Sequence, residues 1–213
     1  MPIVFEGPYQ IIKIGDMGPY NNNGYIIADP VTKEAYLVDA PAQIERLLDE
    51  AKNFRVKGVL ITHSHPDHVA GYKDLKRLSD FPFFVHEADA DKFPGKPENL
   101  LAFGDDLRVG NIRIRVLHTP GHTPGGICLA LDVALISGDT LFPGGPGRTR
   151  SATDFKQVIS SITTQLHSLP EPTLVLPGHG KDTTIGDSKR EYAIFASNPH
   201  PEDLHDNVTW LAS

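Results

Sequence analysis

The stretch THSHPDH at residues 62–68 places three histidines and one aspartate within seven positions. It continues the apolar run VKGVLIT (56–62), which is typical of a buried strand. Imidazole and carboxylate groups bind divalent transition metals, so this density of them favours a metal site over a structural role. The pattern predicts a strand that ends in a metal-binding loop.

The spacing within this loop divides its polar side chains into two pairs. Side chains alternate along an extended segment, so His63 and His65 can point to the same side. Pro66 suits the first turn of a helix, which sets Asp67 and His68 beyond the end of the strand. We expect the first pair to bind one metal ion and the second pair to bind another.

Three further strand ends carry matching groups in loops that are mostly rich in glycine or proline. The stretches TPGHTPGG, ISGDTLF and LPGHG supply His122, Asp139 and His179. Glycine in such loops lets the backbone approach a bound ion closely. The predicted metal ligands are His63, His65 and His122 for one ion, Asp67, His68 and His179 for a second, and Asp139 as the bridging carboxylate.

The rest of the chain alternates short strands with helices. Strands are predicted over 10–15, 24–29, 34–40, 56–62, 82–86, 106–110, 111–119, 126–131, 133–139 and 173–180. Helices are predicted near 41–51, 67–79 and 153–168, with a further helix and a polar tail after LPGHG. Each half has strands, a helix and then a strand that ends in a histidine-bearing loop. This predicts two packed sheets with helices outside, and residues 1–213 as a single domain.

Several local features carry more specific expectations. NNNG at 21–24 is typical of a turn. Asp39 is either the N-cap of the following helix or a brace for the site. Ser151 and Asp154 predict a variant capping box at the start of the third helix.

Charge and composition narrow the class of protein. The 213 residues carry a net charge of −7, and this acidic balance argues against a nucleic-acid partner. The longest apolar stretch, ICLALDVALIS, is broken by Asp132 and is too short to span a bilayer. The N-terminus lacks the pattern of a signal peptide, and the single cysteine, Cys128, can form no internal disulfide. We therefore expect a cytoplasmic protein without a membrane partner.

The four loops in this order and spacing resemble the metallo-β-lactamase superfamily, over about residues 10–185. The motifs THSHPDH, GHTPGG, SGDTLF and PGHG fill every position of that family's dinuclear ligand set. The resemblance implies an α/β (α+β) fold, the αββα sandwich, with two mixed β-sheets flanked by helices. It also implies that the seven residues named above bind the metal ions.

The ligand set is most similar to that of glyoxalase II, also called hydroxyacylglutathione hydrolase. Zinc β-lactamases of this family usually have a cysteine where Asp139 stands, and Cys128 lies inside a predicted strand as a small buried side chain. The resemblance therefore implies a thioester hydrolase of the glyoxalase II type. Persulfide dioxygenases, which share almost the same ligands but use a single iron, are the alternative. A lactone or ester hydrolase and a non-catalytic metal-binding scaffold rank behind both.

Two features depart from the glyoxalase II pattern. Only about thirty residues follow PGHG, so the helical domain that helps glyoxalase II bind glutathione is absent or reduced to a stub. The loop LFPGGPGRTRSATDF also differs, and its GRT is similar to part of the dioxygenase loop. Arg148 and Arg150 in this loop are candidates to bind an anionic substrate, with a solvated loop as the alternative.

These residues suggest a mechanism for a small-molecule substrate, a thioester by preference. Two divalent ions can share a hydroxide at neutral pH, and this hydroxide attacks the carbonyl carbon. Asp67 is the predicted catalytic residue, because its carboxylate can also orient the hydroxide. The nitrogen and oxygen ligands favour zinc, with iron or manganese as alternatives. The sequence leaves the acyl group, the thiol carrier and the oligomeric state open.

Overall fold

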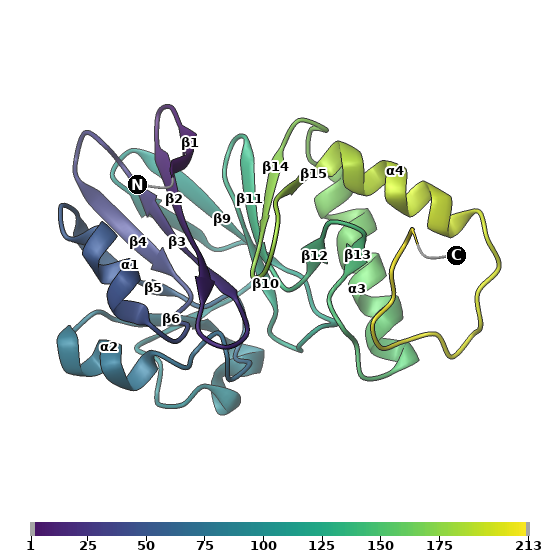
Figure 1. Cartoon of the computed structure of the whole chain (residues 1–213), viewed down its shortest axis with the longest axis horizontal. Coiled ribbons are helices and arrows are strands. Elements are labelled where there is room, and N and C mark those ends of the chain that lie inside the picture. Colours follow the sequence, from purple (N-terminus) through teal and green to yellow (C-terminus); the bar gives the residue numbers. More distant parts are fainter. Residues whose placement is uncertain (1–2, 212–213) are drawn as a thin grey trace.

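The computed structural model describes residues 3–211, which form two packed β-sheets with helices on their outer faces (Figure 1). The first sheet follows the order β1 (Ile3–Glu6), β2 (Gln10–Met17), β3 (Asn22–Ala28), β4 (Glu34–Val38), β5 (Arg55–Leu60), β6 (Phe83–His86) and β7 (Asn99–Leu101). The second follows β15 (Thr183–Thr184), β14 (Leu174–Pro177), β11 (Ala134–Gly138), β10 (Ile127–Ala130), β9 (Ile112–His118) and β8 (Asp106–Val109). Both sheets mix parallel and antiparallel pairs, so the predicted αββα sandwich is confirmed.

The helices cover the two outer faces of this sandwich (Figure 1). The first sheet carries α1 (Ile44–Ala51) and α2 (Tyr72–Leu78), and the second carries α3 (Ala152–Thr164) and α4 (Ile185–Ala196). Two 3₁₀ turns, η1 (Glu87–Lys92) and η2 (Leu166–Ser168), and a small hairpin of β12 (Leu141–Phe142) and β13 (Gly145–Pro146) complete the described elements.

Apolar side chains on both faces of the strands form three layers of core: one between the sheets, one under α1 and α2, and one under α3 and α4. Tyr25 and Ile27 of β3 pack between the sheets against Ile114 and Ile136 of the second sheet. Ile26, which points to the opposite face of β3, packs under α1 and α2. Central strands that are buried on both faces have continuous apolar sequences, and for this reason strands could be predicted over 24–29 and 56–62.

The turn predicted at 21–24 is wrong by three residues. The turn lies at 18–21, and Asn22 and Asn23 are already part of β3. Asn23 Nδ2 donates to the carbonyl oxygens of Pro177 (2.9 Å) and Gly180 (3.1 Å), which belong to the other half of the chain. Both asparagines therefore serve long-range contacts that local turn statistics do not register.

The second helix starts later than predicted. The sequence placed it over 67–79, but α2 begins at Tyr72. The preceding segment bonds to the end of the first sheet, because Ala40 N donates to His68 O (2.9 Å) and Gly71 N donates to Ala40 O (2.8 Å). These bonds hold residues 67–71 in turns instead of a continuous helix.

The third helix begins as predicted and ends sooner. The Ser151 hydroxyl accepts a hydrogen bond from Asp154 N (3.2 Å) and donates one to the Asp154 carboxylate (2.8 Å), so the predicted cap is confirmed. The helix ends at Thr164, and η2 continues the chain toward Pro170. The tail after α4 is not simply polar, because Trp210 is fully buried there.

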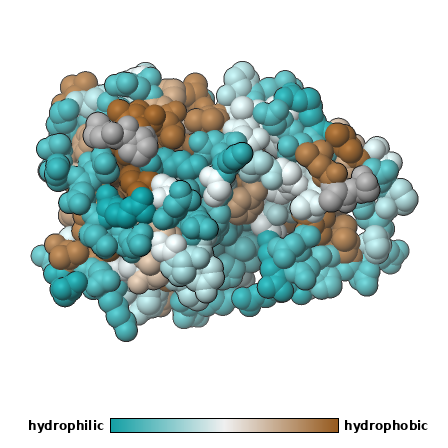
Figure 2. Space-filling model, viewed as in Figure 1, coloured by the Kyte–Doolittle hydropathy of each residue, from teal (hydrophilic) through white to brown (hydrophobic). Residues whose placement is uncertain are grey.

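The face of the molecule seen in Figure 2 is mostly hydrophilic. It carries separate apolar patches near the two ends of the chain. Among residues 3–211, no helix combines the length and the hydrophobicity needed to cross a membrane.

Cys128 lies in β10 and is fully buried, as the sequence predicted. Burial raises the pKa of its thiol to about 11. At pH 8 only about one thiol in a thousand is then ionised, and the thiolate is the reactive form. We expect Ellman's reagent to leave the native protein unlabelled and to titrate one thiol after denaturation; rapid labelling of the native protein would contradict this burial.

Candidate metal centre

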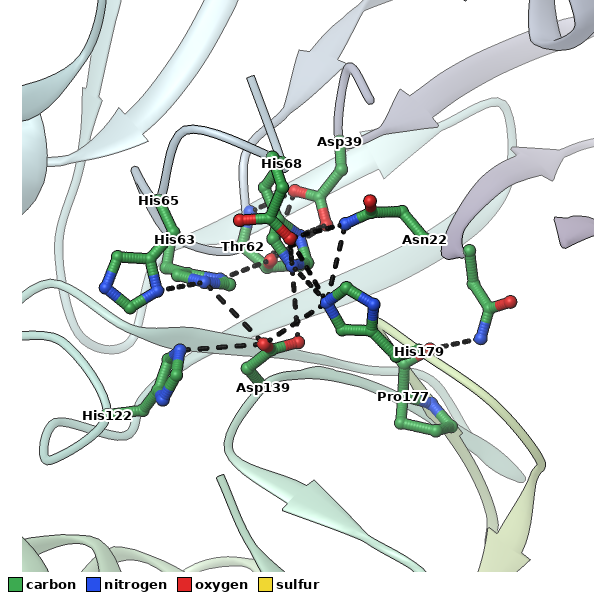
Figure 3. A network of polar contacts seen from close by, with 12 residues as sticks. Asn22, Asp39, Thr62, His63, His65, His68, His122, Asp139, Pro177 and His179 are labelled. Carbon is green, nitrogen blue, oxygen red and sulfur yellow. Dashed lines mark hydrogen bonds and ion pairs between the residues drawn. The ribbon is translucent and has the colours of Figure 1, made fainter. Parts of the chain in front are cut away.

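The four predicted loops meet at one edge of the sandwich (Figure 3). The loop of residues 62–68 leaves the first sheet after β5, and Thr62 O accepts a hydrogen bond from Ile127 N of the second sheet (2.9 Å). Asp139 and His179 follow β11 and β14, which are parallel neighbours and therefore end at the same edge. All seven predicted ligands lie in this cluster.

The first group consists of His63, His65 and His122. One ring nitrogen of each lies within 4.8 Å of the other two. His63 Nε2 is 3.1 Å from His65 Nδ1, so two ring nitrogens face each other. Three imidazole nitrogens arranged in this way suit one divalent transition-metal ion.

The second group consists of Asp67, His68 and His179, whose nearest ligand atoms also lie within 4.8 Å of one another. The Nε2 atoms of His68 and His179 are 3.2 Å apart. Asp67 Oδ2 is 3.2 Å from His179 Nε2. Two nitrogens and one carboxylate oxygen are thus available to a second ion.

Asp139 lies between the two groups. Its Oδ2 atom is 3.5 Å from His122 Nε2 on one side and 3.5 Å from His179 Nε2 on the other. Its Oδ1 atom is 3.3 Å from His68 Nε2. A carboxylate in this position could be shared by two ions.

The outer nitrogens of the histidine rings have partners that fix their tautomers. Carbonyl and carboxylate oxygens can only accept, so the facing ring nitrogen must carry the proton. The pairs are His122 Nδ1 with Arg148 O (2.8 Å), His179 Nδ1 with Tyr20 O (2.9 Å) and His68 Nδ1 with Asp39 Oδ2 (2.8 Å). In the neutral ring each Nε2 then presents a lone pair to the centre, as metal ligation requires.

Two atoms at the centre show directly that the cluster suits a cation. Within residues 3–211, His122 Nε2 and Asp139 Oδ1 are buried and have no hydrogen-bond partner. A buried polar atom without a hydrogen-bond partner costs free energy. Divalent ions held by the seven side chains would satisfy these atoms, so the residues fit a dinuclear metal centre.

Burial favours the neutral form of the three histidines in the first group. Burial, reinforced by the neighbouring His68, holds the pKa of His63 well below its usual value. Burial and the charge of His122 lower the pKa of His65 to about 4. These rings therefore offer lone pairs at pH 7 without first losing a proton.

The second group attracts positive charge. Burial lowers the pKa of His179, but hydrogen bonds to Asp139 and Asp67 outweigh it and raise this pKa to about 10. Burial also lowers the pKa of His68, but the negative charges of Asp139 and Asp39 outweigh burial and raise this pKa well above its usual value. Without a metal ion, protons must supply the positive charge that the carboxylates demand.

Asp39 braces the site and does not cap α1. The N-cap position of α1 is occupied by Gln43. Asp39 is buried, and its Oδ1 atom accepts a hydrogen bond from Thr62 N (2.8 Å) while Oδ2 accepts from the Thr62 hydroxyl (2.9 Å) and from His68 Nδ1. Of the two alternatives that the sequence left open, the brace is therefore the correct one.

Asp89 is a further buried carboxylate near the site, and the sequence gave no sign of it. Its oxygens accept hydrogen bonds from Ser64 N (3.0 Å), the Thr123 hydroxyl (2.8 Å) and Gly125 N (2.8 Å). Ser64 and Thr123 belong to the two loops that supply the first group. Asp89 thus ties these loops together, although the sequence HEADADK does not distinguish it from its acidic neighbours.

Asn22 is a second residue that the sequence did not assign to the site. Its side-chain amide donates a hydrogen bond to Asp67 Oδ2 (2.8 Å). The sequence NNNG predicts only a local turn, whereas this contact joins positions 45 residues apart.

Arg148 and Arg150 line a cavity of about 390 Å³ together with His65 and His122. Arg148 also forms an ion pair with Asp206, its Nε atom 2.5 Å from Oδ1. Arg150 is exposed and has no ion-pair partner among residues 3–211. The two predicted substrate-binding residues therefore border the site, and they differ in how their charge is compensated.

Metal binding should raise the thermal stability of the protein. A ligand present at a hundred times its Kd stabilises by about 2.7 kcal/mol per site, so two ions should raise Tm by roughly 10–20 °C for a chain of this size. Differential scanning fluorimetry of chelated protein, before and after addition of zinc, measures the shift. Calcium, which prefers oxygen ligands, should give no comparable shift, and equal effects of zinc and calcium would contradict a centre of this kind.

Comparison with known proteins agrees with the metal-binding geometry described above. A profile of the metallo-beta-lactamase superfamily matches residues 17–179. An uncharacterized protein of Aquifex aeolicus is 37% identical over 87% of this chain and 97% of its own length. A hydroxyacylglutathione hydrolase of Nitrosococcus oceani is 37% identical over 91% and 78%. The hydroxyacylglutathione hydrolase GloC of Haemophilus influenzae is 33% identical over 87% and 98%.

Solved structures with the same fold include a metallo-beta-lactamase and two proteins with other names. BLEG-1, described as a B3 metallo-beta-lactamase, is 27% identical with a TM-score of 0.77 over 84% of this chain and 96% of that one. ETHE1 from Myxococcus xanthus is 29% identical with a TM-score of 0.75 over 88% and 86%. TTHA1623, solved in a di-iron-bound form, is 28% identical with a TM-score of 0.68 over 84% and 97%.

Proposed function

The chain belongs to the metallo-beta-lactamase superfamily as a metal-dependent hydrolase, and we propose that its substrate is a small thioester of the hydroxyacylglutathione type. The observation that carries this proposal is the position of Asp139, whose carboxylate lies between two groups of three ligands each. A relative of nearly the same length as this chain, GloC, is named a hydroxyacylglutathione hydrolase and supports the same substrate class.

Two divalent ions at these residues would supply a hydroxide at neutral pH and electrophilic stabilisation of the carbonyl oxygen. In the overall reaction, water adds to the thioester carbonyl carbon, the carbon–sulfur bond breaks, and a carboxylic acid and a thiol result. His63, His65 and His122 would hold one ion, Asp67, His68 and His179 the other, and Asp139 both. No redox partner is needed.

Asp67 is the residue we assign to orienting the attacking water. Its Oδ2 atom is held by the Asn22 amide (2.8 Å) and lies 3.2 Å from His179 Nε2. These contacts fix the plane of the carboxylate and leave Oδ1 to accept a hydrogen bond from the water. In the metal-free protein, burial raises the pKa of Asp67, but hydrogen bonds to His179 and Asn22 and the nearby His68 together hold this pKa well below its usual range.

The direct test is thiol release from S-lactoylglutathione by protein loaded separately with zinc, manganese and iron. We expect hydrolysis that falls about 10²–10³-fold in His63→Ala, because that variant removes a ligand of the first ion. His167→Ala, which changes a histidine outside the four loops, should retain activity and serves as the matched control. No thiol release with any metal would overturn the substrate assignment.

A persulfide dioxygenase is the second candidate, favoured by the similarity to ETHE1. The two candidates differ in metal content and in co-substrate. Metal analysis of the purified protein and oxygen uptake by iron-loaded protein with glutathione persulfide distinguish them. A single iron with oxygen uptake supports the dioxygenase, and two ions with thiol release support the hydrolase.

A further inference from the structure

We propose that residues 206–210, here named the strap, form one wall of the substrate cleft and select an apolar group next to the reacting carbonyl. The inference rests on the proposed function for the site that the strap borders. It concerns a segment that lies beyond the residues matched by the family profile, which end at His179.

Trp210 anchors one end of the strap. Its side chain is fully buried, and its ring centroid lies 5.3 Å from that of Tyr192 in α4. Its backbone N donates a hydrogen bond to Gly144 O (2.7 Å) in the loop that follows Asp139. A buried tryptophan makes a large apolar contribution, so this end of the strap is held firmly.

Asp206 anchors the other end. It forms a two-way backbone bridge with Thr149, through Thr149 N to Asp206 O (3.2 Å) and Asp206 N to Thr149 O (3.1 Å). Its carboxylate also pairs with the Arg148 side chain. Only three residues separate the two anchors, so the intervening backbone has little freedom.

The strap lies directly against the loop that carries the cleft. A Cβ atom at Gly145 would come within 2.8 Å of Val208 O, and Gly145 has a φ of +148°. A residue other than glycine would be strained there and would displace the strap. Figure 1 shows the chain after α4 turning back past α3 toward β13, where this contact is made.

The resulting cleft has a volume of about 350 Å³ and opens onto the metal centre. Its lining includes His122, Asp139 and His179 of the centre. It also includes the apolar residues Phe142, Pro143, Pro146 and Val208, beside the polar Arg148, Asn207 and Thr209, and Val208 comes from the strap. A group bound at the metal centre and directed toward these apolar residues would meet apolar surface.

The two arginines of the loop after Asp139 differ in charge compensation, and this difference also favours an apolar group beside the strap. Asp206 neutralises Arg148, whereas Arg150 keeps its charge in the cavity on the other side of His122. The metal centre is then bordered by the strap-lined cleft with its apolar residues and by the separate cavity that contains Arg150. A thioester with an apolar group on one side of the carbonyl and an anionic group on the other would match both.

The test uses cobalt-loaded protein and two hydroxamic acids that bind metal through the same group. Acetohydroxamic acid has a methyl group, and phenylacetohydroxamic acid adds an apolar ring; the visible cobalt spectrum reports each Kd. We expect the preference for the aromatic ligand to fall about tenfold in Val208→Asp and about threefold in Val208→Ala. The Kd of acetohydroxamic acid should stay unchanged.

Val31→Asp is the matched control, because it introduces the same charge at an exposed position in the β3–β4 turn. It should leave the preference unaltered. If Val208→Asp also weakens acetohydroxamic acid, the strap has been displaced, and Val208→Ala decides. An unaltered preference in Val208→Ala, or in a Val208→Asp protein that binds acetohydroxamic acid normally, would overturn the proposal.

The outcome is separable from that of the proposed function, since the hydroxamates require bound metal and not thioester hydrolysis. A strap-dependent preference in a protein that does not cleave S-lactoylglutathione would sustain the strap and reject that substrate. Thiol release together with a strap-independent preference would sustain the hydrolase and reject the strap.

Discussion

Asp139→Asn should lower thioester hydrolysis by about 10²–10³-fold and reduce the bound metal from two equivalents toward one. The substitution preserves the size of the side chain and removes the negative charge that lies between the two groups. In the unsubstituted protein Asp139 Oδ2 is 3.5 Å from both His122 Nε2 and His179 Nε2. In the variant, one neutral amide would therefore face ligands of both ions. An amide also presents an NH₂ group, which cannot bind a cation. Metal analysis after gel filtration and the thiol-release assay measure the two effects.

Asp132→Asn provides the control for this prediction. Asp132 is an exposed aspartate in the β10–β11 turn, so the same change of chemistry occurs away from the centre. It should retain both ions and full activity. Two tightly held ions and unimpaired hydrolysis in Asp139→Asn would remove the bridging role from the mechanism.

Asp89→Ala should lower the free energy of unfolding by about 3 kcal/mol and weaken metal binding by the first group. The carboxylate is fully buried and accepts from two backbone N–H groups, of Ser64 and Gly125, and from the Thr123 hydroxyl. Removing it leaves all three donors buried without a partner. The loops that carry His65 and His122 then lose their connection, so the ion they hold should be released first.

Urea denaturation of zinc-loaded protein measures the stability, and stepwise titration with a chelator measures the two metal affinities. Asp91→Ala is the matched control, since Asp91 is an exposed aspartate of the same 3₁₀ turn. Asp89→Asn should lie between wild type and alanine, because the amide retains one acceptor oxygen. Equal loss of both ions in Asp89→Ala would indicate general destabilisation and not a tie between the two loops.

Much of the fold was accessible from the sequence because its signals are local. The apolar runs around Ile26 and Leu60 are dense enough to mark central strands, and Ser151 with Asp154 marks the start of α3. Errors occurred where a distant partner decides the backbone. Backbone hydrogen bonds to Ala40 keep residues 67–71 in turns, and Asn23, which belongs to β3, bonds through its side chain to Pro177 O.

The sequence by itself determined the identity of the seven candidate ligands, because imidazole and carboxylate groups at four strand ends form a recognisable chemical pattern. Their neighbours were decided only by the tertiary structure. Asp39, Asp89 and the strap act through hydrogen bonds and packing between segments far apart in the chain. The type of a residue states what its side chain can bind, whereas the packing of the two sheets settles which donors and acceptors come within reach of it.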